Sequence, residues 1–230
     1  MNTLIISYAS KGRDDYHKGI KRLIDSCSNK GYDLRMYSND MPEGERREYN
    51  IQTFDVTPHS QVPYKFKLEL INKAVQDGYT KIVWLDSSLQ LVRDVNELFN
   101  ESAGFCFHNL GHPLKKYISD VCASNLILSD EELEVTPQIW GGAFGLDFTN
   151  PDAHKILRAL IRQSELGSFN EGSSDREGFV AHRHDQAVMS VIFKRYKVKM
   201  YDYGYITTAS HCFDPFEYGN HSYIYHLSIN

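Results

Sequence analysis

The sequence predicts an α/β fold in which helices cover both faces of a mostly parallel central sheet. Three observations support this prediction: short apolar, β-branched runs alternate with segments of helical periodicity, glycines follow the helical segments, and polar residues follow the apolar runs. Strands that alternate with helices along a chain usually pair in parallel. With 230 residues and no linker, repeat or low-complexity tract, the chain is predicted to form a single domain over residues 1–230.

The first strands and the first helix follow one another closely. Thr3–Ala9 is short, apolar and β-branched, which predicts a buried strand. Asp14–Asn29 carries apolar residues at helical spacing and ends just before Gly31, so it is predicted to be a helix. Tyr32–Ser38 alternates like a strand, and the charged stretch Asn39–Arg47 is predicted to be a surface loop.

The middle of the chain contains the strongest strand signal. Pro63 precedes an amphipathic helix at Tyr64–Asp77, whose apolar residues share one face. Lys81–Leu89 then places a continuous apolar run before one carboxylate and two hydroxyls, which indicates a central strand that ends at the ligand-binding edge. A second strand–helix unit is predicted over Phe105–Leu128.

The last third of the chain repeats this alternation. Gln138–Phe148 is apolar and interrupted by three glycines. Ala153–Leu166 and Asp185–Tyr196 are predicted to be helices, with the polar loop Ser168–Gly178 between them. Two short strands complete the prediction, at Val198–Tyr203 and Tyr223–His226.

Charge and hydropathy exclude some classes of function. The net charge of -5 arises from interleaved acidic and basic residues, which argues against non-specific binding to nucleic acids or membrane surfaces. No apolar run approaches the roughly twenty residues that a membrane span needs, and no secretory signal is present, so a cytoplasmic location is expected. Cys27, Cys106, Cys122 and Cys212 are widely spaced and are predicted to be reduced thiols, mostly in the core.

A carboxylate at the end of the central strand is the first candidate for chemistry. Asp86 directly follows the apolar run and precedes Ser87 and Ser88. A carboxylate at this edge can hold a divalent cation, which in turn binds a diphosphate. The same residue could instead cap a turn or the following helix.

A second candidate site opens the helix Asp185–Tyr196. Two imidazoles, a guanidinium, a carboxylate and an amide follow one another there: His182, Arg183, His184, Asp185 and Gln186. The free N–H groups of a helix N-terminus suit an oxygen-rich ligand. The alternative is that Asp185 only caps the helix and the basic side chains are solvated.

Glycines and histidines give weaker signals. Gly141, Gly142 and Gly145 lie among bulky apolar residues, where the backbone turns or approaches a ligand closely. The pattern matches neither a P-loop nor a dinucleotide fingerprint. His226, with His221 nearby, is a lone histidine on a terminal strand, which is more often structural than a metal ligand. Motifs of serine hydrolases and zinc proteases are absent.

Taken in order, these segments resemble the GT-A-fold glycosyltransferases, with features of family 8. The resemblance covers about residues 3–226. Its motifs are PYKFKLELINKAV followed by YTKIVWLDSSLQLVRDVNELF, then IWGGAFGLDFTN, HRHDQAVMSVIF and the closing YIYHL. The fold implied is a nucleotide-diphospho-sugar transferase fold in one domain.

The resemblance also implies roles for individual residues. Asp185 and Gln186 would be catalytic and would hydrogen-bond the sugar near its reacting carbon. The residues implied in donor binding are Lys67 (or Lys65), Trp84, Asp86, Ser88, Gly141, Gly142, Arg183 and His184. Asp86 and His226 would hold a divalent cation, Mn²⁺ or Mg²⁺. Because Ser88 stands where a second aspartate is expected, the sequence leaves metal dependence open.

The implied reaction moves a sugar from a nucleotide-diphosphate sugar, such as a UDP- or GDP-sugar, to a hydroxyl of a glycan or small acceptor. If the reaction inverts the anomeric carbon, Asp185 is the candidate base. The polar loops His108–Lys116 and Ser168–Gly178 are candidates for the acceptor site.

Two other functions are compatible with parts of the sequence. A non-catalytic protein that binds carbohydrates or nucleotide sugars on the same fold is the main alternative, supported by the Asp-Ser-Ser run. A nucleotidyltransferase would be expected to have a glycine-rich basic loop after the first strand, and Ser7–Arg13 matches that poorly.

Overall fold

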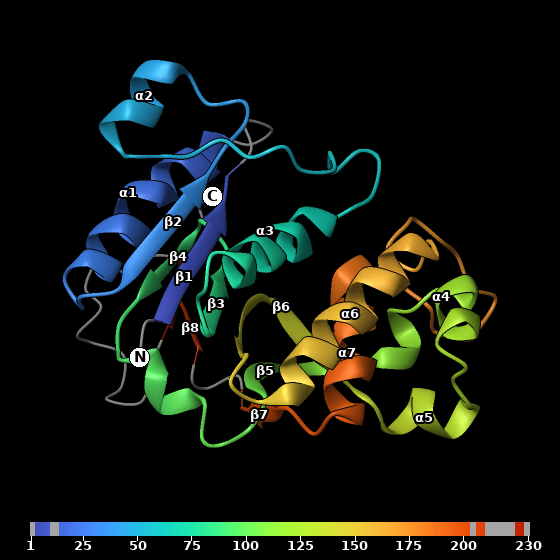
Figure 1. Ribbon diagram of the computed structural model, residues 1–230. Coiled ribbons are helices and arrows are strands. Elements are labelled where there is room, and N and C mark those ends of the chain that lie inside the picture. Colours follow the sequence, from blue (N-terminus) through green and yellow to red (C-terminus); the bar gives the residue numbers. More distant parts are fainter. Residues whose placement is uncertain (1–2, 10–13, 203–205, 210–223, 228–230) are drawn as a thin grey trace.

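A mixed six-stranded sheet lies at the centre of the protein (Figure 1). The computed structural model describes residues 3–9, 14–202, 206–209 and 224–227. The strands of the central sheet are β1 (Thr3–Tyr8), β2 (Asp33–Tyr37), β3 (Lys81–Leu85), β5 (Gly104–Pro113), β6 (Pro137–Asp147) and β7 (Lys199–Tyr201). A smaller sheet consists of β4 (Leu89–Leu91), β8 (Ile206–Ala209) and β9 (Ile224–Leu227).

Helices connect most of these strands. The α-helices are α1 (Asp14–Ser28), α2 (Glu43–Glu48), α3 (Lys65–Gln76), α4 (Asp120–Asn125), α5 (Asp130–Val135), α6 (Pro151–Glu165) and α7 (His184–Arg195). Two 3₁₀ turns are η1 (Val95–Leu98) and η2 (Leu114–Lys116). Within the described residues, no helix combines the length and apolar character needed to cross a bilayer.

The central sheet is mostly parallel, as the sequence predicts. Its strand order is β2-β1-β3-β6-β5-β7. β1 pairs in parallel with both β2 and β3, and β5 pairs in parallel with β7. Only β6 is reversed, because it pairs antiparallel with both β3 and β5. The carboxyl end of β3 therefore lies beside the middle of β6, where Leu85 pairs with Ala143.

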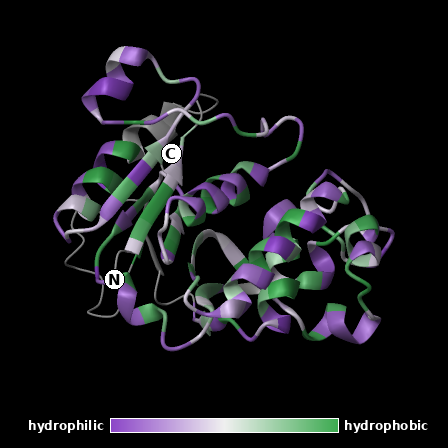
Figure 2. Ribbon diagram, viewed as in Figure 1, coloured by the Kyte–Doolittle hydropathy of each residue, from purple (hydrophilic) through white to green (hydrophobic). Residues whose placement is uncertain are grey.

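Side chains of the central strands alternate between two cores, one on each face of the sheet. Leu4, Ile6 and Trp84 pack into the core formed with α3, α6 and α7. Ile5 and Val83, their neighbours in sequence, pack into the core formed with α1 and the small sheet. This period of two is what a strand covered on both faces requires. Figure 2 shows β1 as a hydrophobic strand and α2 as a largely hydrophilic helix.

The second face is covered by one helix and the small sheet together. Helix α1 contributes Ile20, Leu23 and Cys27 to this core, and β4 contributes Leu89 and Leu91. β4 and β8 each pair with β9. Helices thus lie on both faces, as predicted, but the small sheet shares one face with α1.

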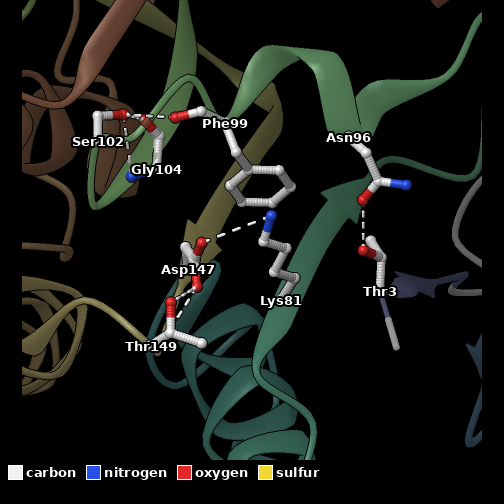
Figure 3. A network of polar contacts seen from close by, with 8 residues as sticks. All are labelled: Thr3, Lys81, Asn96, Phe99, Ser102, Gly104, Asp147 and Thr149. Carbon is white, nitrogen blue, oxygen red and sulfur yellow. Dashed lines mark hydrogen bonds and ion pairs between the residues drawn. The ribbon is translucent and has the colours of Figure 1, made fainter. Parts of the chain in front are cut away.

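The amino-terminal edge of β3 is closed by a network of polar contacts (Figure 3). Lys81 Nζ lies 3.6 Å from Asp147 Oδ2 and 4.9 Å from the centre of the Phe99 ring. Nearby, Thr3 donates a hydrogen bond of 2.5 Å to Asn96. These contacts tie η1 to the ends of β1, β3 and β6, so the polar groups of this edge serve the fold.

Several parts of the secondary structure differ from the sequence prediction. The strand predicted over Lys81–Leu89 ends at Leu85, and β4 and β8 were not predicted. The stretch Asn39–Arg47 was predicted to be a loop, but it contains most of α2, whose ends are joined by an ion pair between Glu43 and Arg47. Helix α5 was not predicted. Its start carries a capping box between Ser129 and Glu132, a pattern that the sequence does contain.

The segment that contains α4 and α5 leaves the sheet after β5 and returns to it at β6, and these two points are adjacent. It begins after β5 and ends before β6, and the residues at these two ends, Pro113 and Pro137, are paired. Leu114 N also donates to Thr136 O at 3.3 Å. The segment is therefore an excursion from the sheet with adjoining ends.

The cysteines behave as predicted where the structure describes them. Cys27, Cys106 and Cys122 are buried free thiols. Burial raises the pKa of Cys27 and of Cys122 to about 12, which makes both thiols unreactive at neutral pH. Cys212 lies outside the described residues.

Candidate active site

A cavity of about 230 Å³ lies at the carboxyl edge of the central sheet, beside the end of β3. Its walls come from the start of α3, the turn after β3, the first half of β6 and the segment entering α7. Among the residues predicted from the sequence, those that line the cavity are Lys67, Asp86, Gly141, Gly142, His182, Arg183, His184, Asp185 and Gln186. The fold thus brings together residues from four separate segments of the sequence.

The ammonium group of Lys67 connects three of these segments. Its Nζ lies 3.0 Å from Asp185 Oδ2 and 3.7 Å from Asp86 Oδ1, and it donates to Gly141 O at 2.9 Å. The side chain is only 4% exposed. A buried ammonium is stable only when anions or hydrogen-bond acceptors surround it, and here both are present.

Burial and charge shift the pKa values of this pair. Burial alone would lower the pKa of Lys67, but the carboxylates of Asp185 and Asp86 outweigh it and raise that pKa, so the ammonium stays charged. Burial also raises the pKa of Asp185, against the opposing effect of Lys67. Asp185 Oδ2 has no well-aligned hydrogen-bond donor in the described part of the chain, and its close contact is the ion pair.

Asp86 lies in the tight turn that follows β3. Its backbone N–H donates to Gly142 O at 2.8 Å, and its carbonyl accepts from Leu89 N at 2.9 Å. The indole of Trp84, buried below the turn, donates to Asp86 Oδ1 at 2.8 Å. The carboxylate is fixed in this way while 38% of the side chain remains exposed.

Gly141 and Gly142 lie in a bulge of β6. Between Ile139 and Phe144 the strand contains three more residues than the facing segment of β5 between Cys106 and His108. Bulges of this kind turn a strand away from its partner and are common beside active sites. Here the bulge directs Gly141 O to Lys67 and Gly142 O to the turn after β3.

Neighbouring side chains explain why these positions are glycine. A Cβ on Gly142 would lie 2.6 Å from the indole of Trp140, so the ring occupies the space that a side chain would need. A Cβ on Gly141 would meet only ordinary contacts, 3.4–3.6 Å from Gln186, Met189 and Asp185. Gly142 therefore makes room for Trp140, a half-buried part of the cavity wall.

Arg183, directly before α7, and two of the first residues of α7 line the cavity with three different side chains. Arg183 is exposed, and its guanidinium lies 5.3 Å from the centre of the Tyr117 ring. His184 has a left-handed backbone, with φ of 43°. Gln186 accepts from Gly141 N through Oε1 at 3.4 Å, which links α7 to the bulge.

His182 holds the neighbouring loops together. It is buried, its Nδ1 accepts from Ser119 N at 3.2 Å, and its Nε2 lies 2.9 Å from Ser168 O. A carbonyl can only accept, so Nε2 carries the hydrogen and the ring is neutral. Burial lowers the pKa of His182 below its ordinary value of 6.5.

This neutral histidine predicts a loss of stability in mild acid. The unfolded chain binds a proton at His182 more readily than the folded chain, so stability is highest above about 6.5 and falls as the pH drops below that value. Urea unfolding at pH 7.5 and 5.5 is expected to show this loss in the unaltered chain. His182→Asn, which cannot titrate, is expected to show a smaller loss. An equal loss in both chains would contradict the assignment.

Three predicted residues do not line the cavity. Lys65 lies 3.7 Å from Glu69 on the same helix, so only Lys67 enters the site. Trp84 supports Asp86 from below, and Ser88 is half-buried in the turn after β3. The geometry thus separates Ser88 from the cavity that Asp86 lines.

The metal-binding prediction is only partly covered by the described residues. The backbone of His226 lies on β9 opposite Leu89, three residues beyond Asp86. Its side chain lies outside what the structure describes, as does all of His221. Among the described residues, no group of three or more His, Cys, Asp or Glu side chains could hold a metal ion. Of the two predicted metal ligands, Asp86 and His226, only Asp86 has a side chain that the structure describes.

Sequence reasoning missed Tyr64, and it assigned no role in the site to Trp140, Ala181 and His182. Tyr64 precedes α3 and has a φ of 60°, a left-handed conformation that no sequence pattern predicts here. Trp140 could have been found, because a bulky aromatic residue directly before two glycines requires space that only glycine leaves.

Comparisons with known proteins bear on the fold. No sequence profile of a known protein family matches the chain, and no curated protein sequence matches it. Among solved structures, the galactosyltransferase LgtC in complex with donor and acceptor sugar analogues is similar, with a TM-score of 0.58 and 13% identity. That match covers 97% of this chain and 86% of LgtC.

The bifunctional glycosyltransferase WbbM is also similar, with a TM-score of 0.64 and 12% identity. The match covers all of this chain but 46% of the WbbM chain, so the protein spans about half the length of that relative. At such low identities the likeness concerns the fold. The chain therefore has the GT-A-type α/β fold of these glycosyltransferases, which confirms the predicted fold class.

Proposed function

We propose that the protein is a glycosyltransferase that moves a sugar from a nucleotide-diphosphate sugar to an acceptor hydroxyl. The observation that carries the proposal is the pair of carboxylates, Asp86 and Asp185, held at one cavity by the buried ammonium of Lys67. In sheets of this kind ligands bind at the carboxyl ends of the strands. The shared fold with two glycosyltransferases supports the same function.

The cavity is suited to a neutral, hydroxyl-rich group. Asp86 is partly exposed, so its carboxylate can accept hydrogen bonds from sugar hydroxyls, and Asp185 lines the same cavity. With Lys67, these groups give the floor of the site one net negative charge. Asp185 and Gln186 would then contact the sugar near its reacting carbon, as the sequence predicts.

The leaving group must be stabilised as negative charge develops on the diphosphate. Arg183 is the exposed cation at the cavity, and Lys67 adds a fixed positive charge beneath it. Lys67 is already bound by three protein oxygens, so in this proposal it acts through its field and through the carboxylates that it orders.

A divalent cation stays a prediction of the sequence. The described residues offer Asp86, with its Oδ1 already bound by Trp84, and this single carboxylate does not make a cation site by itself. No step of the proposed reaction is assigned to a metal. The UDP- or GDP-sugar donor, the glycan or small hydroxylated acceptor and the cytoplasmic location belong to the same proposal.

A second candidate function is non-catalytic binding of a nucleotide sugar. It is favoured by Ser88, which replaces the expected second aspartate and does not line the cavity. Such a protein would bind a donor and release no nucleotide.

A donor panel distinguishes the two functions. UDP-, GDP-, CMP- and TDP-sugars are incubated with the protein in Mn²⁺, in Mg²⁺ and in EDTA, and nucleotide release is followed. We expect release from one donor, and its loss in Asp86→Ala. Donor binding by calorimetry without release, across the whole panel, would favour the non-catalytic function. The EDTA sample tests the predicted cation.

A further inference from the structure

Helix α1 contains a glycine in its interior, at Gly19. This residue is the sixth of the 15 residues of α1, and it is buried. A glycine inside a helix is less favourable than an alanine, because it gives up more backbone freedom on folding. The φ of Gly19 is not positive, so the backbone conformation does not require glycine. The reason for a glycine must therefore lie in its surroundings.

The backbone of the turn after β3 occupies the space beside Gly19. A Cβ at this position would lie 2.3 Å from Ser87 O and 3.0 Å from Ser88 Cα. Non-bonded carbon and oxygen atoms do not approach one another so closely. Backbone atoms, unlike the end of a flexible side chain, cannot rotate away from such a contact. Gly19 therefore lets α1 lie directly against the turn that begins at Asp86.

A second contact, two helical turns further along α1, fixes the helix on the same segment. Ser26 Oγ accepts from Leu91 N at 3.0 Å and donates to Leu23 O at 2.9 Å. Seven residues of helix rise about 10 Å, and the four residues from Ser87 to Leu91 span at most about 13 Å. The two contacts therefore belong to one stripe of α1, which follows the chain from Ser87 to Leu91.

Asp86 is held from both sides of the sheet. On one side, the indole of Trp84 donates to Asp86 Oδ1 at 2.8 Å, and Trp84 packs into the core formed with α3, α6 and α7. On the other side, α1 covers the turn, and Ser87 is only 1% exposed. The backbone N–H of Asp86, which donates to Gly142 O at 2.8 Å, joins the turn to β6 between these layers. The position of the carboxylate thus depends on how closely α1 approaches.

We infer that Gly19 is a positioning residue, which holds the Asp86 carboxylate at the cavity by letting α1 press on the turn. Its effect on turnover rests on the proposed function, whereas its effect on the position of Asp86 does not. A methyl group at Gly19 must displace either the helix or the turn. The helix is anchored by three side chains that are at most 1% exposed, Ile20, Leu23 and Cys27. The Asp86 side chain is 38% exposed, so the turn yields and Asp86 moves with it.

Gly19→Ala tests the inference, and Gly104→Ala is its matched control. Alanine favours the helix, so any loss in Gly19→Ala comes from the contact with the turn. A Cβ on Gly104 would lie 2.1 Å from Gly145 O, so this change also forces a methyl group against backbone. Gly104 pairs with Leu146, which lies opposite Ile82 near the amino end of β3 and away from the cavity. Urea unfolding should show a loss of stability in the control as well.

The indole N–H of Trp84 reports the position of Asp86 without any substrate. The chain has two tryptophans, so isotope-labelled protein gives two indole signals in NMR, and Trp140→Phe assigns them. Asp86→Ala removes the acceptor of the Trp84 bond and defines the shift that marks its loss. We expect the Trp84 signal of Gly19→Ala to move upfield in the same direction, because a bond to a carboxylate deshields the proton. Gly104→Ala should leave this signal in place.

Turnover is the second readout, measured as hydrolysis of the donor that the panel identifies. We expect kcat/KM to fall about 100-fold in Gly19→Ala and to stay within about twofold in Gly104→Ala, because a misplacement of about 1 Å can cost this much. Ser26→Ala frees Leu91 N from α1 without adding volume. This milder variant should move the Trp84 signal in the same direction, and it replaces Gly19→Ala if that variant does not fold.

Two results would overturn the inference. One is an equal effect of Gly19→Ala and Gly104→Ala on the Trp84 signal, and the other is a Trp84 signal that both α1 variants leave unchanged. The proposed function fails in a different way. If the unaltered protein turned over no donor while the Trp84 signal shifted as expected, the proposed function would be contradicted and the positioning of Asp86 by Gly19 would stand.

Discussion

Replacing Lys67 with methionine is expected to lower the free energy of unfolding by about 3–5 kcal/mol, the usual consequence of removing one partner from a buried ion pair. Lys67 and Asp185 are 4% and 6% exposed, so water cannot solvate the carboxylate that is left behind. Methionine fills a similar volume, which limits the effect of a cavity. Urea denaturation measures the change.

The control for this substitution lies on the same helix. Lys65→Met removes a lysine that is 24% exposed and pairs with Glu69 at 3.7 Å, so a change of at most about 1 kcal/mol is expected. The double variant Lys67→Met, Asp185→Asn should recover part of the lost stability, because it leaves no buried charge unpaired. If Lys65→Met and Lys67→Met were equally stable, the buried Lys67–Asp185 pair would not contribute to the free energy of unfolding as predicted.

The stability of Lys67→Met should also depend on pH in a definite direction. Burial raises the pKa of Asp185 in the folded chain, and loss of Lys67 removes an effect that lowers it. The folded variant then binds a proton more readily than the unfolded chain, so its stability should increase as the pH falls towards the ordinary aspartate value. A stability that decreases as the pH falls would show that another titratable group dominates the pH dependence.

A methyl group at Gly142 should be far more harmful than one at the adjacent glycine. The Cβ of Gly142→Ala would lie 2.6 Å from the Trp140 ring, which must move, and overpacking of this kind costs about 1–3 kcal/mol. Because Trp140 is part of the cavity wall, we also expect donor affinity to fall at least about tenfold, as 1.4 kcal/mol corresponds to a factor of ten.

Gly141→Ala provides the matched comparison, since its nearest contacts would be 3.4–3.6 Å. Urea unfolding and calorimetry with the donor from the panel measure both variants. If Gly141→Ala had the larger effect on affinity, the ligand rather than Trp140 would occupy the space beside the glycines. That result would favour the role that the resemblance implies for Gly141 and Gly142, in which the sugar approaches the backbone.

Much of the fold could be predicted from local patterns. The run Lys81–Leu85 is apolar on both faces because two cores flank it, and that makes a central strand easy to recognise. The reversed direction of β6 could not be predicted, because strand direction depends on partners distant in the sequence. Helix α2 was missed because it has no buried residues and therefore no apolar periodicity.

The candidate site shows the same division between local and distant information. Asp86 and Asp185 could be found because each lies at the boundary of an element, where sequence patterns are informative. Their contact through Lys67 depends on the packing of α3 against the sheet, which no local pattern specifies. The hydrogen bond of 2.9 Å between His184 Nδ1 and Phe169 O likewise depends on a backbone carbonyl fifteen residues away that the sequence cannot position.

The excursion between Pro113 and Pro137 has a consequence for how such chains can diversify. Its two ends are paired, so residues can be added or removed between them without shifting the register of β5 against β6. Yet Ser119, within the excursion, donates to His182 at the cavity. The excursion can therefore change in size and chemistry as an interchangeable module, while Asp86 after β3 and Asp185 on α7 keep their positions.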